Sequence, residues 1–200
     1  ISFHLLVTLL IPTVNRTLIA ISFSILAFSI LTVVLVGCQS FSKEQKVLVF
    51  SMTEGYRHSS IADGKAAIMT LGLENGFKVD STENPAIFTD EGLAQYDAVV
   101  FLSTTGNILD ESQQIAFQRF IQSGGGYVGI HAASDTEYEW PWYGQLVGGY
   151  FVNHPAIQEA RLIVEDPNDS STRHLAAEWM HTDEWYNHRM VRDGLTILVS

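Results

Sequence analysis

The segment that most constrains the fold of this chain is residues 124–135, which read Gly-Gly-Gly-Tyr-Val-Gly-Ile-His-Ala-Ala-Ser-Asp. Its three glycines follow apolar residues at helical spacing and supply the left-handed conformation that ends a helix. The apolar run at 127–130 is short, which predicts an inner β-strand. His131 then stands at the carboxyl end of that strand, where open α/β sheets bind their ligands.

The turn after this strand indicates what kind of chemistry to expect. A strand, a sharp turn and a helix with a reactive residue at the turn make up a nucleophile elbow. Here the imidazole of His131 takes the place of a Ser or Cys nucleophile, which favours acid–base or metal chemistry over acyl transfer. Glycines 124–126 do not form a phosphate loop, because they follow a helix instead of opening one. The alternative interpretation of His131 is a core histidine that is hydrogen-bonded to backbone groups.

The rest of the chain alternates apolar strands with helices. This order predicts right-handed β-α-β units and a mainly parallel sheet. Asp110 and Gln113 have the spacing of a capping box. Strands are expected at residues 46–51, 77–80, 97–102, 127–130, 158–165 and 195–199, and helices after residues 60, 89 and 110. The first helix is expected to turn Ile61, Ala66, Ile68, Met69 and Leu73 toward the core.

Residues 1–38 have the pattern of an export signal. Arg16 precedes an apolar run over residues 18–36, and polar sequence begins after Cys38. The Leu-Val-Gly-Cys end resembles the lipobox of bacterial lipoproteins, which implies that Cys38 is lipidated and anchors the protein to a membrane. An uncleaved transmembrane anchor is the alternative, since about 20 apolar residues span a bilayer. Either way we expect a linker at 39–45 and an exported domain at 46–200.

Composition limits the partners and the redox chemistry. The net charge of −11 predicts repulsion from nucleic acids, whereas neutral sugars and cations remain open as ligands. Cys38 is the only cysteine, so no intramolecular disulfide is expected. Because that thiol lies in the signal region, a glutaminase using a cysteine nucleophile is not expected either. The sequence does not indicate an oligomeric state.

Candidate site residues follow several of the expected strands, whose carboxyl ends should share one edge of the sheet. Neighbouring residues in a strand point to opposite faces, so only one of Asp183 and Glu184 is expected in a pocket, and we favour Glu184. The structural alternatives are a surface position for His58, a turn at His154 and a solvated acidic pair at 183–184. The candidates are Glu54, Arg57, His58, Thr105, Gly106, His131, Ala132, His154, Asp183, Glu184 and Tyr186, and the same loops also carry Thr104 and Asp135.

A divalent metal such as zinc is an open alternative at this edge. His58, His131 and His154, with Asp183 or Glu184, have suitable ligand chemistry. Their spacing is not a metal signature, so no cofactor is certain from the sequence.

The chain resembles the ThuA-like, or trehalose utilisation, family. The resemblance covers about residues 46–190 and rests on Gly-Tyr-Arg-His at 55–58 and on the segments 96–101, 124–133, 146–155 and 183–186. It implies the class I glutamine amidotransferase-like variant of a flavodoxin-like fold, a three-layer α/β sandwich with a mainly parallel sheet. It also implies that His131 stands where the amidotransferases have their cysteine, and that a C-terminal part of the family is missing here.

The family is associated with sugar utilisation, which implies an enzyme on carbohydrate or oxidised-sugar substrates, of hydrolase or isomerase type. His131 would act as general acid or base, and Glu184 would orient it or carry a second proton. Backbone N–H groups at Thr105, Gly106 and Ala132 would face a developing oxyanion. The remaining candidates, His58 and Tyr186 foremost, would bind substrate. A non-catalytic sugar-binding or scaffold lipoprotein is the alternative.

Overall fold

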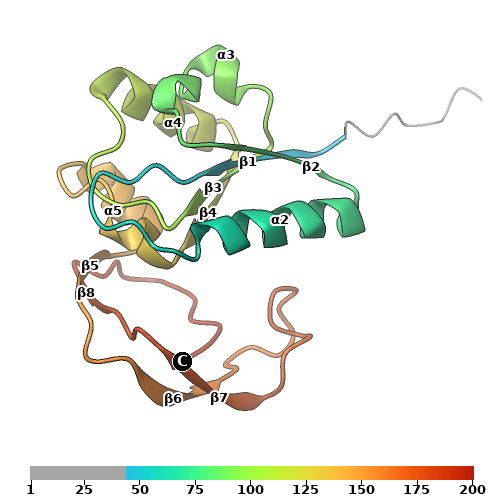
Figure 1. Cartoon of the computed structure of the whole chain (residues 1–200), viewed down its shortest axis with the longest axis vertical. Helices are drawn as coiled ribbons and strands as arrows, with labels where there is room; N and C mark the ends of the chain where they lie inside the picture. The colour runs from blue at the N-terminus through green and yellow to red at the C-terminus, as the bar shows by residue number, and fades with distance from the viewer. Residues whose placement is uncertain (1–43) are drawn as a thin grey trace, which may run out of the picture. The chain divides into compact units, whose positions relative to one another are not determined.

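A four-stranded parallel sheet with the order β2-β1-β3-β4 organises the fold in the computed structural model, which describes residues 44–200 (Figure 1). The expected signal region and Cys38 lie outside the described residues. Within the described part, no helix has the length and apolarity needed to cross a membrane. The four strands are β1 (Lys46–Phe50), β2 (Lys78–Thr82), β3 (Ala98–Leu102) and β4 (Gly126–Ile130).

Helices cover both faces of this sheet. Ile68 of α2 (Ile61–Asn75) packs against the face formed by Val49 and Val100. The opposite face meets α4 (Glu111–Gln122) and α5 (Pro141–Val147), while the short α3 (Asp90–Leu93) packs on α4. Figure 1 shows α2 on the opposite side of the sheet from α3 and α4. The expected α/β fold with a mainly parallel sheet is therefore confirmed.

An aromatic cluster fixes the position of β3. The Phe101 ring is fully buried and lies 5.4 Å from Phe50, 5.2 Å from Phe117 and 5.7 Å from Tyr143, between ring centroids. Burying such a side chain stabilises the fold by about 1.5–3 kcal/mol, and each favourable ring pair adds about 0.5–1.5 kcal/mol. This cluster joins β1, β3, α4 and α5, so the loops that follow β1 and β3 start from a rigid base.

The inward face of α2 differs from the expected one. The prediction was right for Ile61 and Ile68, but Ala66, Met69 and Leu73 are exposed. Two glycines lie against the sheet instead. A Cβ on Gly64 would come within 2.9 Å of Leu102, and one on Gly72 would come within 2.7 Å of the Phe77 carbonyl oxygen. The helix lies so close to the strands at these two positions that only glycine fits there.

The expectation that residues 127–130 form an inner strand was wrong. Among the described strands, β4 pairs only with β3 and lies at the edge of the sheet. Val128 is 49% exposed, whereas the Tyr127 ring packs 5.6 Å from Phe101. A short apolar run is needed wherever one face of a strand is buried, so it does not distinguish an inner strand from an edge strand.

The last part of the chain forms two small antiparallel sheets. Strand β5 (Tyr150–Asn153) pairs with β8 (Asn187–Arg189), and β6 (Gln158–Ile163) pairs with β7 (Glu178–Asp183). The strand expected at 158–165 is therefore present as β6. The strand expected at 195–199 was wrong, because that segment makes only a single bridge between Val199 and Val164. Its apolar residues predicted a strand, but only Leu198 and Ser200 form backbone hydrogen bonds with residues 163–165, a pairing too short for a strand.

A buried carboxylate ties the loops on the α4 side together. One oxygen of Glu137 accepts the backbone N–H groups of Ile108 and Leu109, each at 2.8 Å, and the other accepts the Gln114 amide at 2.7 Å. The Glu137 side chain is fully buried, and burial raises its pKa. Three donors compensate the loss of water, so Glu137 holds the entry to α4 against the segment that follows His131.

We expect Glu137→Ala to lower the free energy of unfolding by about 2–4 kcal/mol, because two buried N–H groups lose their acceptor. Urea unfolding followed by circular dichroism would measure the loss. Glu137→Gln is the matched control: it keeps one acceptor oxygen and the volume, so it should lose less than half as much. Equal stability of the wild type and the Ala variant would contradict this role.

Candidate functional site

Loops from three parallel strands supply one wall of the site. His58 follows β1, Thr105 follows β3, and His131 follows β4 at the start of the 3-10 helix η2 (His131–Asp135). Because β1, β3 and β4 run parallel, their carboxyl ends lie at the same edge of the sheet. The chain leaves β1 toward β2 on one side and later returns to β3 on the other. The site therefore lies at a topological switch point, where open α/β sheets bind ligands.

The local backbone turns the His131 side chain out of the strand direction. His131 has φ of 53°, a left-handed conformation that non-glycine residues adopt infrequently. The two residues after it, Ala132 and Ala133, are almost fully buried. Their small side chains let the turn fold tightly onto the sheet. The strained residue thus carries the functional group, while its small neighbours hold the turn in place.

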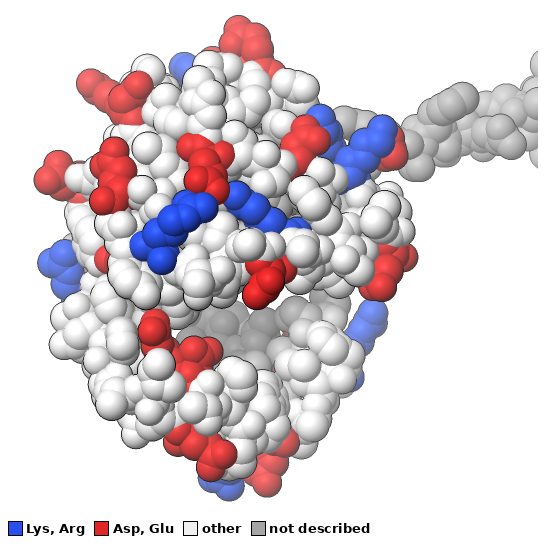
Figure 2. Space-filling model, viewed as in Figure 1, with Lys and Arg blue, Asp and Glu red and all other residues white. Residues whose placement is uncertain are grey.

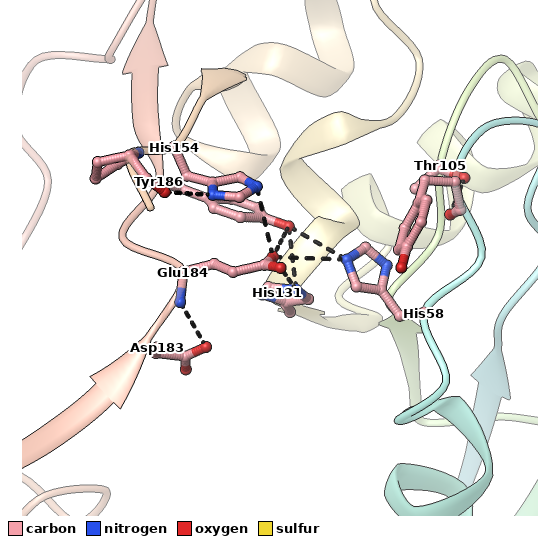
Figure 3. A network of polar contacts seen from close by, with 9 residues as sticks. His58, Thr105, His131, His154, Asp183, Glu184 and Tyr186 are labelled. Carbon is pink, nitrogen blue, oxygen red and sulfur yellow. Dashed lines mark hydrogen bonds and ion pairs between the residues drawn. The ribbon is translucent and has the colours of Figure 1, made fainter. Parts of the chain in front are cut away.

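The second wall comes from the C-terminal sheets. Glu184 and Tyr186 lie in the connection between β7 and β8, and His154 follows β5. These residues are more than 50 positions from His58, and the pairing of β5 with β8 brings them to the sheet edge. Figure 3 shows the Glu184 carboxylate extending between the imidazoles of His154, His131 and His58.

One carboxylate oxygen is the centre of the cluster. Glu184 Oε2 lies 3.4 Å from His131 Nε2, 3.9 Å from His58 Nε2 and 3.9 Å from His154 Nε2. The side chains of Glu184 and His131 are each about one quarter exposed, and that of His58 is more deeply buried. Three imidazole nitrogens and a carboxylate oxygen therefore share a partly desolvated space in which charges interact more strongly than in water.

The Tyr186 hydroxyl lies within this group. It is 3.1 Å from His131 Nε2, 3.5 Å from His58 Nε2 and 3.5 Å from Glu184 Oε2. Burial, and then the negative charges of Glu184 and Asp135, raise the pKa of Tyr186. The hydroxyl therefore keeps its proton and can donate a hydrogen bond to one neighbour at a time. Tyr186 is positioned both to orient His131 and to hydrogen-bond a ligand.

The surroundings of His58 favour its neutral form. Burial lowers the pKa of His58, and the nearby His131 lowers it further, while Glu184 and Asp135 act in the opposite direction. His58 is therefore neutral at neutral pH.

The surface charge of the molecule is mixed. Figure 2 shows Asp and Glu side chains spread over the face it presents, with Lys and Arg beside several of them.

A pocket of about 330 Å³ adjoins the cluster. The rings of Phe151 and Tyr186 lie 4.2 Å apart in its wall, and Tyr56 packs edge-on against His58 at 4.8 Å. Two larger pockets of about 530 and 580 Å³ lie beside β2, but the concentration of histidines belongs to the smaller one. Its lining residues are Tyr56, His58, Asp135, Phe151, His154, Glu184 and Tyr186.

The candidates lacked Tyr56 and Phe151, whereas Asp135 was expected at this edge with His131. Both missing residues have a signal in the sequence: Tyr56 is two residues before His58, and Phe151 is three before His154. Spacing to a neighbouring histidine would have included both. Tyr138 donates its hydroxyl hydrogen to Asp135 and so fixes that carboxylate in the wall.

Several candidates are not brought to the cluster. Arg57 pairs with Glu83 through two contacts of 3.0 and 2.8 Å, and the Glu54 side chain is exposed outside the pocket lining. Asp183 accepts the Glu184 backbone N–H at 2.8 Å and otherwise faces His181. Asp183 therefore supports the Glu184 backbone, while neither Arg57 nor Glu54 lines the pocket of the histidines.

One of the three expected oxyanion donors serves the scaffold instead. The Gly106 N–H donates to the Asp135 carbonyl oxygen at 2.9 Å, so it is already satisfied. Thr105 is fully buried; its hydroxyl accepts the Gly55 N–H and donates to the Tyr56 carbonyl oxygen. Ala132 is likewise fully buried. The Gly106 N–H thus joins two neighbouring loops, which the sequence pattern alone did not indicate.

Comparisons with known proteins agree with this fold. The profile of the family ThuA, described as trehalose utilisation, matches residues 46–200. A ThuA-like protein from Bacteroides uniformis ATCC 8492 has 24% identity and a TM-score of 0.67, over 81% of this chain and 70% of that one. A ThuA-like protein from Parabacteroides merdae ATCC 43184 has 20% identity and a TM-score of 0.58, over 72% of this chain and 63% of that one. Among curated proteins there is no significant match.

The contacts of Glu83 predict a pH-dependent stability. Arg57, and then Lys65, lower the pKa of the Glu83 carboxyl from 4.5 to about 2. Since the folded-state pKa is the lower one, this stabilisation is present above pH 4.5 and is lost as the pH falls toward 2.

We expect Glu83→Gln to cost roughly 1 kcal/mol at pH 7, because the partners are partly exposed and screened. The difference from the wild type should shrink at pH 3, as measured by urea unfolding at both pH values. A difference that is the same at pH 7 and pH 3 would show that Glu83 does not contribute through its charge.

Proposed function

Because the chain belongs to the ThuA family of trehalose utilisation, we propose that it is an enzyme processing carbohydrates at the pocket of His131 and Glu184. The single observation that carries this proposal is the 3.4 Å approach of His131 Nε2 to Glu184 Oε2 beside that pocket. An imidazole next to a carboxylate can accept a proton, because the carboxylate stabilises the imidazolium that forms. The reaction class is hydrolysis or isomerisation of a sugar or an oxidised sugar.

The character of the pocket supports a small neutral ligand. Its volume of about 330 Å³ lies near the lower end of small-molecule sites, which are about 300–1,000 Å³. The rings of Tyr56 and Phe151 offer apolar faces to the C–H groups of a sugar. His58, His154 and Tyr186 offer polar atoms to its hydroxyls. The carboxylates of Glu184 and Asp135 disfavour anionic substrates, so neutral sugars are the better fit.

In this proposal His131 touches the reacting atoms of the substrate. It takes a proton from a substrate hydroxyl, or from a carbon beside a carbonyl group, and returns it to another atom. Glu184 holds the resulting imidazolium in place and can carry the second proton transfer. The Tyr186 hydroxyl, which keeps its proton, donates a hydrogen bond to the substrate oxygen on which charge develops.

We also propose that the domain works outside the cytoplasm, attached to a membrane through a lipid on Cys38. The support comes from the sequence: one basic residue, the apolar run at 18–36 and the Leu-Val-Gly-Cys end. Metabolic labelling with a fatty acid would test it, since Cys38→Ala should remove both the label and the membrane association.

We expect His131→Asn and Glu184→Gln each to reduce turnover by about 10²–10⁴-fold, the range for general acid–base groups. Asn suits the left-handed backbone at this position and lacks a titratable ring, so the loss reports on chemistry and not on strain. The assay is product formation from trehalose, glucose and their keto derivatives, followed by nuclear magnetic resonance. His174→Asn, which changes an exposed histidine outside the pocket, is the control.

The same experiment separates the enzyme from a binding module. Calorimetry with these sugars should show binding in the wild type and in both pocket variants, with turnover lost only in the variants. Binding without turnover in any protein would favour the sugar-binding or scaffold alternative. Full turnover by His131→Asn would show that His131 is not the acid or base.

A further inference from the structure

We propose that His58, His131 and Glu184 form a binding site for one divalent transition-metal cation, with zinc as the representative ion. The inference rests on the proposed function for its pocket and substrate class, and it adds an electrophile to that pocket. Each of the three side chains offers one ligand atom, and these atoms lie within 4.8 Å of one another. Among the described residues, His58, His131 and Glu184 are the one group of three or more His, Cys, Asp or Glu side chains whose ligand atoms lie this close together.

The distances suit a common central ion. Zinc binds imidazole nitrogens and carboxylate oxygens at about 2.0–2.2 Å, so neighbouring ligand atoms of a tetrahedral ion lie about 3.4 Å apart. The approach of His131 Nε2 to Glu184 Oε2 is 3.4 Å, and that of His58 Nε2 is 3.9 Å. The three ligand atoms lie within 4.8 Å of one another, so the His58 ring has to rotate toward the other two to complete the arrangement.

His58 has the freedom to make this movement. Its Nδ1 atom is buried and has no hydrogen-bond partner in the described part of the structure. Around the ring lie Tyr56 at 4.8 Å and His131 at 4.5 Å, both edge-on. A small rotation therefore breaks no hydrogen bond at Nδ1. The strongest interactions open to His58 lie on its Nε2 side, toward Glu184.

The cluster is rich in lone pairs that a cation can accept. Each neutral imidazole has one lone pair beside its single N–H, the Glu184 carboxylate has several, and Tyr186 contributes a single O–H. His131 Nε2 and His58 Nε2 lie 3.4 and 3.9 Å from Glu184 Oε2, which is longer than the usual hydrogen-bond distance. A cation bound by all three groups would relieve the repulsion among these lone pairs.

The ligand types determine which ions fit. Two imidazoles and a carboxylate match catalytic zinc sites and other first-row transition metals, whereas calcium and magnesium prefer oxygen ligands alone. The set differs from three histidines: His154 Nε2 lies 3.9 Å from Glu184 Oε2 but is outside the group of mutually close ligand atoms. Three protein ligands leave a position open toward the pocket, as catalytic sites require.

A bound cation would divide the roles in the pocket. His131 would then be a ligand in place of the acid–base role proposed above, and the ion would bind a hydroxyl or carbonyl oxygen of the sugar at its open position and polarise it. Proton transfer would then pass to His154 beside Glu184, while Tyr186, which keeps its proton, would donate a hydrogen bond to the substrate. The ion deepens the proposed function by giving an electrophile to a site whose expected backbone N–H donor at Gly106 is already occupied.

The test uses the 200-residue chain, stripped with a chelator and titrated with Zn²⁺ by calorimetry. We expect one equivalent to bind, and His58→Gln and Glu184→Gln each to weaken binding by at least the 10- to 100-fold that loss of an outer-shell partner costs. His154→Gln should weaken it less than 10-fold, and His174→Gln should leave it unchanged. Absence of binding, or equal binding by the His58 and Glu184 variants and the wild type, would overturn the metal site.

A second measurement covers variants that fail to fold. Zn²⁺ added to the stripped wild type should shift the imidazole resonances of His58 and His131 and leave that of the exposed His174 in place; shifts at other histidines alone would overturn the site. The two proposals fail separately. Sugar turnover that survives chelation and still needs His131 overturns the ion only, whereas Zn²⁺ binding without any sugar binding overturns the carbohydrate function only.

Discussion

The parallel pairing of β3 with both β1 and β4 is the constraint on which the site depends. It places the loops after three strands at one edge of the sheet, and the Phe101 cluster holds β3 in place from behind. Packed aromatic rings resist displacement, because any shift opens a cavity that costs several kcal/mol. His58 and His131 therefore keep their ring centroids 4.5 Å apart although 73 residues separate them in the chain.

The second constraint is the pairing of β5 with β8. It brings Glu184 and Tyr186 to His154 and onward to the sheet edge, so that the pocket has one wall from each part of the fold. A carboxylate that shares a partly buried space with three imidazoles gains little for stability, since desolvation opposes the attraction of the charges. The cluster is therefore better explained by a role in binding a ligand or a cation, or in transferring a proton, than by a role in stability.

Some elements of the fold could be predicted from the sequence because their causes are local. Continuous apolar runs gave β1 and β3, and the Asp110–Gln113 capping box is present at the start of α4. The inward face of α2 could not be predicted in this way, because Gly64 and Gly72 lie inward to allow a close approach that only the packed sheet creates. The edge position of β4 likewise depends on which strands pair, and a five-residue segment does not encode that.

The same distinction applies to the site. The sequence by itself determined the kinds of groups available: histidines after strand ends, a Glu184 beside a Tyr186, and a turn at His131 that only small residues follow. Tertiary structure decided which of them meet. It placed Glu184 Oε2 among three imidazoles, paired Arg57 with Glu83 outside the pocket, and used the Gly106 N–H to join two loops. The physical reason is that residue chemistry and turn propensity are local properties, whereas a distance between side chains far apart in the chain is fixed only by packing and strand pairing.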